Sequence, residues 1–332
     1  MNLHLKMKAL TLFVVLNCTL SITAMAGSID FSDYEQFNTF IFNDFYGDNS
    51  DVEGRLAVGG NASLNNYSIN EYRSPGRSGP VHSTDSRVLS VAGDLHLSNS
   101  LVNGKTSVGG AISITNSALN DLTGEAVDFN EAYRQLSQTA TNLANLDINT
   151  TITSENGKFR LQGNSSADVQ VFQLTSSLLS TAWGFDVIDI DITDTIIFNI
   201  SGNNAQLSGA NFYNYDSVFD AADLGSHTEN IIFNFYQASY LHIDTGVWGS
   251  ILALNADINC GSGVVWGQVY AQSWGSQANP CNVQVNYSPF YERELAQDTI
   301  TIDEPANAFL IFSTLAFLYT RRQKITAQYS KL

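Results

Sequence analysis

Short segments of alternating apolar and polar residues recur along the first third of the chain. Residues 54–64, 87–97 and 104–114 share one pattern, which is a short strand, a bend of small residues and a second short strand. The last two copies are 17 positions apart, and the first two are 33 apart because a polar insert, residues 67–85, separates them. Strand side chains alternate between two faces, and small residues permit corners. The pattern predicts a mainly β fold, a parallel β-solenoid whose coils must stack to bury their apolar face.

One amphipathic helix is predicted after these coils. Asp128, followed three residues later by Glu131, has the pattern of a capping box. Apolar residues then recur at helical spacing on one face, as far as about Leu146. They are Phe129, Tyr133, Leu136, Ala140 and Leu143. We expect the helix to lie along the flank of the solenoid, because its apolar stripe must be buried.

Strand patterns resume after the helix. They cover residues 149–154, 158–162, 169–174, 187–193, 196–200, 231–235, 240–243, 247–254 and 264–270. Residues 249–253 and 267–271 repeat one pattern 18 positions apart, which is again the length of one coil. The solenoid is therefore predicted to continue on both sides of the helix in the sequence.

The first 26 residues have the pattern of a signal peptide. Lys6 and Lys8 precede the apolar residues 9–16 and 18–22, and the segment ends on small residues. This order predicts cleavage between Ala26 and Gly27. An uncleaved membrane helix is the weaker interpretation, because the apolar run is shorter than the roughly 20 residues that a span needs.

The C-terminal residues 303–332 form a second export-related segment. Asp303, Glu304 and Pro305 precede the mostly apolar residues 306–320 and a basic end that includes Arg321 and Arg322. This order resembles the PEP-CTERM sorting tail, which an exosortase recognises and processes, although Asp303 stands where that motif usually has its first proline. An ordinary single-span anchor is the alternative, and it would also leave the domain outside the cytoplasm.

The charge between these two ends is strongly acidic. The chain has 15 basic and 32 acidic residues, and 9 and 30 of them lie between the ends. Such a surface repels phosphates, so we expect neither nucleic acid nor anionic lipid as a partner. In an oxidising compartment Cys260 and Cys281 are predicted to form a disulfide that contributes about 3 kcal/mol.

Two groups of segments resemble the choice-of-anchor A family. Residues 40–45 and 50–61 match its opening signature, and residues 249–253 and 267–271 match its closing coils. The resemblance spans residues 31–287 and departs at Leu254, where the family usually has proline. It implies a bacterial surface protein with an adhesive role, and no catalytic residues come with it. Together with the two ends of the chain, we expect export to the surface or extracellular matrix of a Gram-negative bacterium. The predicted domains are residues 1–26, 27–290 for the solenoid, 291–302 for a linker, and 303–332 for the tail.

Candidate chemistry is sparse. The sequence has no Gly-x-Ser-x-Gly elbow and no His-Glu-x-x-His motif, and we expect no enzyme. Asp189 and Asp191 on one strand face are the only candidates for a pair of carboxylates that cleaves polysaccharide, and a solvated acidic face is the simpler interpretation. An oxygen-rich segment offers possible Ca²⁺ ligands, although its spacing is not that of an EF-hand. These residues are Asp44, Asp48, Asn49 and Asp51.

Aromatic residues crowd the late coils, and four of them are candidate ligand-binding residues. These are Trp248, Trp266, Trp274 and Tyr270. Exposed on one side they would stack on sugars, whereas buried they would pack the core. We therefore expect a surface adhesin or biofilm-matrix protein that binds an extracellular polysaccharide or other surface ligand, with no cofactor besides possible Ca²⁺. The order of coils, helix and coils also resembles ice-binding solenoids, so an ice-binding protein and a carbohydrate-binding or carbohydrate-cleaving β-helix protein are the alternatives.

Overall fold

The computed structural model describes residues 29, 31–73, 76–122, 127–191, 193–208, 212–214, 217–218 and 228–290. Within these residues the strands form one sheet of 21 strands and another of five. Neither α-helix in this part of the chain is long and apolar enough to cross a bilayer.

The predicted export and sorting residues lie outside the described ranges. They are Ala26 and Gly27 at the cleavage site and Asp303, Glu304, Pro305, Arg321 and Arg322 in the tail.

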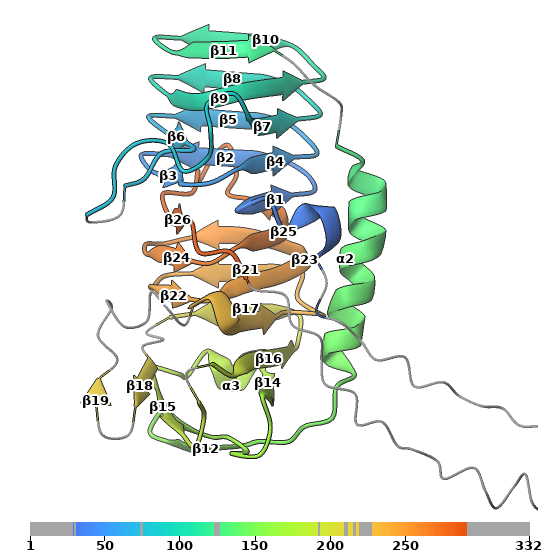
Figure 1. Ribbon diagram of the computed structural model, residues 1–332, viewed down its shortest axis with the longest axis vertical. Coiled ribbons are helices and arrows are strands. Elements are labelled where there is room, and N and C mark those ends of the chain that lie inside the picture. The colour runs from blue at the N-terminus through green and yellow to red at the C-terminus, as the bar shows by residue number, and fades with distance from the viewer. Residues whose placement is uncertain are drawn as a thin grey trace, which may run out of the picture. The chain divides into compact units, whose positions relative to one another are not determined.

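The first stack of coils contains the repeats found in the sequence (Figure 1). After a 3₁₀ turn, η1 (Ser32–Tyr34), its strands are β1 (Thr39–Ile41), β2 (Phe45–Asp48), β3 (Asp51–Val52), β4 (Leu56–Val58), β5 (Ala62–Asn65), β6 (Ser68–Ile69), β7 (Arg87–Val91), β8 (Leu95–Ser98), β9 (Leu101–Val108), β10 (Ile112–Thr115) and β11 (Ala118–Leu122). Strands of successive coils pair in parallel, as in the series β2, β5, β8 and β10. This arrangement confirms the predicted parallel β-solenoid.

The second stack follows the long helix α2 (Phe129–Ala144). Its elements are β14 (Val169–Thr175), α3 (Ser176–Leu179), β16 (Thr195–Ser201), β17 (Asn204–Leu207), η2 (Thr228–Asn230), β20 (Ile231–Asn234), β21 (Tyr240–Ile243), β22 (Val247–Trp248), β23 (Ser250–Cys260), β24 (Val264–Trp266), β25 (Val269–Trp274) and β26 (Gln284–Asn286). The five-stranded sheet contains β12 (Thr151–Glu155), β13 (Lys158–Gln162), β15 (Gly184–Ile188), β18 (Phe212–Asn214) and β19 (Ser217–Val218). β12 and β13 are antiparallel, whereas β13, β15 and β18 are parallel.

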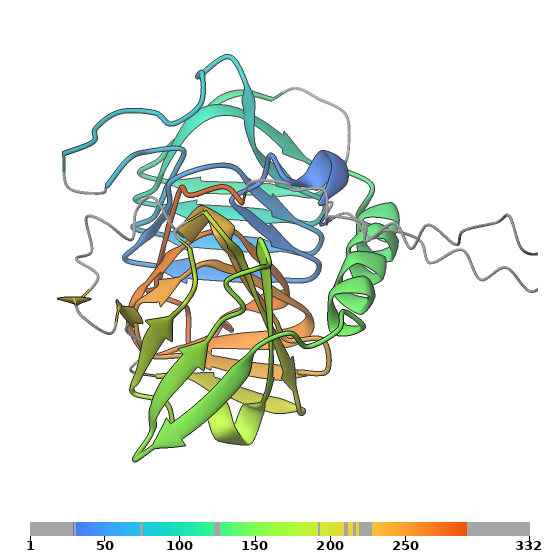
Figure 2. The same ribbon diagram turned by 60° about the horizontal axis from the view of Figure 1, so that its bottom comes forward.

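The spatial order of the coils differs from their order in the chain. Thr39 of β1 pairs with Leu56 on one side and with Val269 on the other. The first coil therefore joins the two stacks, while α2 runs beside the coils between the end of the first stack and the start of the second (Figures 1 and 2).

The strands form three faces along the coils. The helix face contains β14, β16, β20, the first halves of β23 and β25, β1, β4 and β7. The polar face contains β17, β21, the second halves of β23 and β25, β2, β5, β8 and β10. The tryptophan face contains β22, β24, β26, β3, β6 and the start of β9.

The helix covers the helix face, as its sequence pattern predicts. Asp128 is the N-cap and accepts hydrogen bonds from two backbone N–H groups of the first turn. The buried helix residues are Ala132, Leu136, Thr139, Ala140 and Leu143. Tyr133, which we predicted in the apolar stripe, is instead 38% exposed, and its hydroxyl donates to Asn255 at 2.6 Å.

Two buried amides fix the helix on the sheet. Asn199 Nδ2 donates to the backbone oxygen of Leu143 at 2.6 Å, and Asn234 Nδ2 donates to that of Ala140 at 2.9 Å. Asn199 and Asn234 are opposite each other on β16 and β20 and are fully buried. These bonds define the position of the helix along the coils as well as its distance from them.

Asparagines form a ladder at one corner of the first stack. Asn49, Asn66, Asn99 and Asn116 all have left-handed φ angles between 48° and 52°, a conformation that asparagine tolerates better than most residues. Asn66 Nδ2 donates to Asn49 Oδ1 at 2.7 Å, and Asn116 Nδ2 donates to Asn99 Oδ1 at 3.2 Å. The ladder therefore turns the chain and also links neighbouring coils.

Candidate functional site

Trp248 and Trp266 form an aromatic pair on the tryptophan face. They are opposite each other on β22 and β24, and their rings stack at 5.2 Å with an interplanar angle of 8°. The preceding residues, Val247 and Val265, point inward and are buried, so the alternation of each strand turns the tryptophans outward. Both side chains are half-buried. Trp248 also packs against the core, and the two stacked rings form one half-buried aromatic strip across two coils.

The other two candidate aromatics are core residues. Tyr270 is fully buried on the helix face, where it stacks on Phe31 at 5.0 Å and donates to the backbone oxygen of Tyr34 at 3.2 Å. Trp274 is also fully buried and stacks on Phe45 at 5.9 Å. Their burial removes both residues from any surface that could contact a ligand, which corrects the proposed group of four.

The four candidate Ca²⁺ ligands do not come together. Asp44 Oδ1 accepts the backbone N–H of Asn61 at 2.8 Å. Asp48 accepts from the side-chain amides of Asn49 and Asn65, and Asn49 is part of the asparagine ladder. Asp51 is buried at the next turn of the coil. Within the described residues no group of three or more His, Cys, Asp or Glu is placed to hold a metal ion, so the structure does not support the predicted site.

The two candidate carboxylates of a cleaving site also have separate positions. β15 ends at Ile188, earlier than the predicted strand, because Asp189 turns the chain with a φ of 54°. Asp189 Oδ2 accepts from Gln162 at 2.7 Å, whereas Asp191 Oδ1 accepts from Thr193 at 2.9 Å. The residues therefore belong to a turn, and the shared outward strand face that we predicted is not formed.

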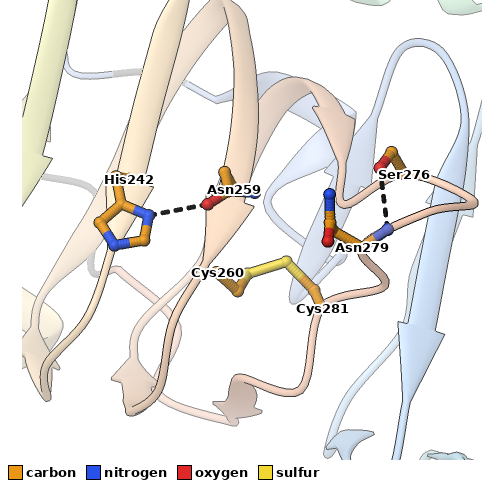
Figure 3. Close-up of a disulfide and its surroundings, with 6 residues drawn as sticks. All are labelled: His242, Asn259, Cys260, Ser276, Asn279 and Cys281. Atoms are coloured by element: carbon orange, nitrogen blue, oxygen red, sulfur yellow. Dashed lines mark hydrogen bonds between the residues drawn. A yellow bond between two sulfur atoms is a disulfide. The ribbon is translucent and has the colours of Figure 1, made fainter.

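The predicted disulfide between Cys260 and Cys281 is present (Figure 3). Cys260 ends β23, and Cys281 lies beside Gly47 of the first coil, to which it is joined by an isolated parallel bridge. The Cα atoms are 5.1 Å apart. The disulfide thus ties a late coil to a segment that contacts the first one.

Histidines are distributed singly. Burial, with a smaller contribution from Arg55, lowers the pKa of His82 to about 4. His96 is exposed on the polar face, and His242 Nδ1 is 2.9 Å from Asn259 Oδ1. His227 lies outside the described residues.

The polar face carries two regular rows of outward side chains on β2, β5, β8 and β10. One row is Tyr46, Ser63, His96 and Ser113, and the other is Asp48, Asn65, Ser98 and Thr115. Thr115 is the only threonine in these two rows. At the other end of this face, a shallow polar groove of about 590 Å³ runs beside Tyr240, His242 and Asn259.

The fold and these faces define a parallel β-solenoid with one covered face and two faces that carry ordered rows of side chains. Residues 30–280 match the model of the family described as "Putative Ice-binding-like adhesive domain", and the chain belongs to that family. The search of curated proteins found no match.

Proposed function

We propose that the chain is an exported adhesin of the surface or biofilm matrix of a Gram-negative bacterium, of the choice-of-anchor A type, that binds an extracellular polysaccharide. Membership in an adhesive-domain family supports the class of function. The stacked, half-buried pair Trp248 and Trp266 is the observation that carries the binding site. Indole rings offer a large apolar surface at low entropic cost, and the C–H face of a sugar ring packs against such a surface. The proposal includes no cofactor, no cleavage of the polysaccharide and no nucleic acid partner.

Replacing both Trp248 and Trp266 with alanine is expected to reduce attachment severalfold, because each ring provides contact area to the ligand. The measurement is the attachment of cells that display the full chain to a surface coated with the matrix polysaccharide of the host. Trp183→Ala is the matched control, because Trp183 is 50% exposed and lies outside the tryptophan face. Surface labelling must show equal display. Unchanged attachment of the double variant would remove the tryptophan pair from the proposal.

Removing residues 303–332 is expected to release the protein into the medium and to lower attachment. The proposed reason is that this PEP-CTERM-like tail is recognised by an exosortase or retains the chain in the membrane. Fractionation of cells and medium checks the localisation, with a Glu304→Gln, Pro305→Ala variant as the narrower change. If the truncated chain stays on the cells, the tail is not a sorting signal.

The two rival functions predict other results. Ice binding through a threonine array is disfavoured by the polar face, where Thr115 stands alone in eight outward positions of β2, β5, β8 and β10. Thermal hysteresis in a solution of the purified chain would support the ice-binding function. Release of reducing sugars from the polysaccharide would support a carbohydrate-cleaving enzyme.

A further inference from the structure

A compact polar pocket of about 300 Å³ lies where the asparagine corner meets the tryptophan face. Its walls come from β3, β6 and β9 and from the insert that follows β6. Its lining includes Asp51, Tyr67, Arg73 and Leu101. This volume is at the lower end of the range for small-molecule sites.

Asp51 is a buried carboxylate on the wall of this pocket. The residue is only 5% exposed, and Oδ2 has no hydrogen-bond donor among the described residues. Burial raises the pKa of Asp51 to about 7, with Glu53 acting in the same direction and Arg73 opposing it. A buried polar atom without a partner costs free energy. A bound ligand that donates to Asp51 would offset this cost.

Tyr67 also lines this pocket, but its ring packs inside the coils against Phe45. The residue is 2% exposed, and its hydroxyl has no partner within the described part of the chain. Gly47 makes room for the ring, since a Cβ atom there would lie 2.7 Å from Tyr67. The Tyr67 hydroxyl therefore belongs to the core, and Asp51 is the lining residue whose unpartnered oxygen points to a ligand or ordered water that completes its hydrogen bonds.

The polar insert places Arg73 at the pocket. The backbone N–H of Arg73 donates to Glu53 Oε1 at 2.9 Å, and Arg73 Nε is 3.4 Å from Ser68 Oγ. Asn70 holds the insert to the coil by exchanging hydrogen bonds with the backbone of His82, at 2.9 and 2.7 Å. Arg73 is therefore the residue of the insert that lines this pocket.

The charges of the pocket select the class of ligand. The guanidinium of Arg73 opposes a cation, and the ionised form of Asp51 opposes an anion. A neutral molecule with several hydroxyl groups both donates to a carboxylate and accepts from a guanidinium. Leu101, 44% exposed, offers an apolar contact beside these polar groups. The combination suits one uncharged sugar residue.

We infer that this pocket binds a single neutral sugar residue, with Asp51 accepting from its hydroxyl groups and Arg73 donating to its oxygens. The inference rests on the proposed function, because it takes a saccharide as the ligand. It adds a pocket for one residue of the chain, separate from the aromatic strip of Trp248 and Trp266.

Saturation-transfer NMR and calorimetry on the purified full chain test the pocket directly. The probes are glucose, galactose, mannose and N-acetylglucosamine, with glucuronic acid and CaCl₂ as charged comparisons. We expect one neutral sugar to bind with a dissociation constant of about 1 mM and to lose about tenfold in affinity in Asp51→Asn and in Arg73→Gln. Asp147→Asn, which removes an exposed carboxylate after the helix, is the matched control. Circular dichroism and thermal melting establish that each variant is folded.

The outcomes separate this inference from the proposed function. Binding that Asp51→Asn weakens and the double tryptophan variant retains supports the pocket, even if cells fail to attach. If cells attach but no sugar binding depends on Asp51, the inference of a sugar-binding pocket is wrong, and the proposed adhesin function is unaffected. Binding of Ca²⁺ or glucuronic acid that depends on Asp51, in place of a neutral sugar, also overturns the inference.

Discussion

Replacing Trp274 with alanine is expected to lower the free energy of unfolding by about 4 kcal/mol. The indole is fully buried and stacks on Phe45 at 5.9 Å, so its removal leaves a large cavity between a late coil and the first one. Urea denaturation followed by circular dichroism measures the change. Trp274→Phe should cost much less, because Trp274 Nε1 is buried without a partner in the described structure and phenylalanine removes that orphaned group.

Trp248→Ala is the control for this prediction. The Trp248 ring is half-buried, so its loss is expected to cost about 1–2 kcal/mol. Equal costs for Trp274→Ala and Trp248→Ala would mean that the two side chains are not placed inward and outward as described.

Removing the disulfide is expected to destabilise the protein by about 3 kcal/mol in the chain-entropy model. The two cysteines are 21 positions apart in sequence, and Cys281 is fully buried beside the first coil. The double variant Cys260→Ala, Cys281→Ala should unfold at lower urea concentration than the oxidised protein. Its midpoint should not change with dithiothreitol.

The reduced form of the unmodified protein provides the comparison. Its stability should approach that of the double variant, because both lack the cross-link. If the reduced protein is as stable as the oxidised one, the disulfide does not stabilise the fold by lowering the conformational entropy of the unfolded chain.

Local signals predicted much of the fold. The helix begins where Asp128 and Glu131 indicate, and the repeats of the first stack correspond to paired coils. These features depend on residues close together in sequence, where capping and alternation leave a clear pattern. By contrast, no local pattern shows that Thr39 pairs with Val269, since 230 positions separate them.

The aromatic residues were harder to place for a physical reason. Strict alternation puts Tyr270 and Trp274 on one side of a strand, yet Tyr270 lies on the helix face and Trp274 points into the core. The pairing register of β23 and β25 shifts between Tyr270 and Trp274, where the chain turns a corner. Beyond this corner the inward and outward positions of β25 are exchanged. Tyr270 is then covered by Phe31, a distant segment that alternation within the strand cannot reveal.

The candidate site was therefore predicted in part. Trp248 and Trp266 lie together at the surface because each follows an inward valine. Asp51 was selected as a metal ligand from its oxygen-rich surroundings, and the structure places it instead in a pocket with Arg73. The polar insert that carries Arg73 interrupts the repeat, so its position over the coil could not be inferred from the repeat.

The position of the first coil between the two stacks has a consequence for how the protein folds. β1 gains its second neighbouring strand only when β25 is available. This pairing must bring together two strands that are far apart in the sequence, which is a slow step in folding. Until then β1 is an edge strand whose unpaired backbone groups can pair with another molecule. Completion of the stack thus depends on the last quarter of the chain, and a chain that stops before residue 269 retains this aggregation-prone edge.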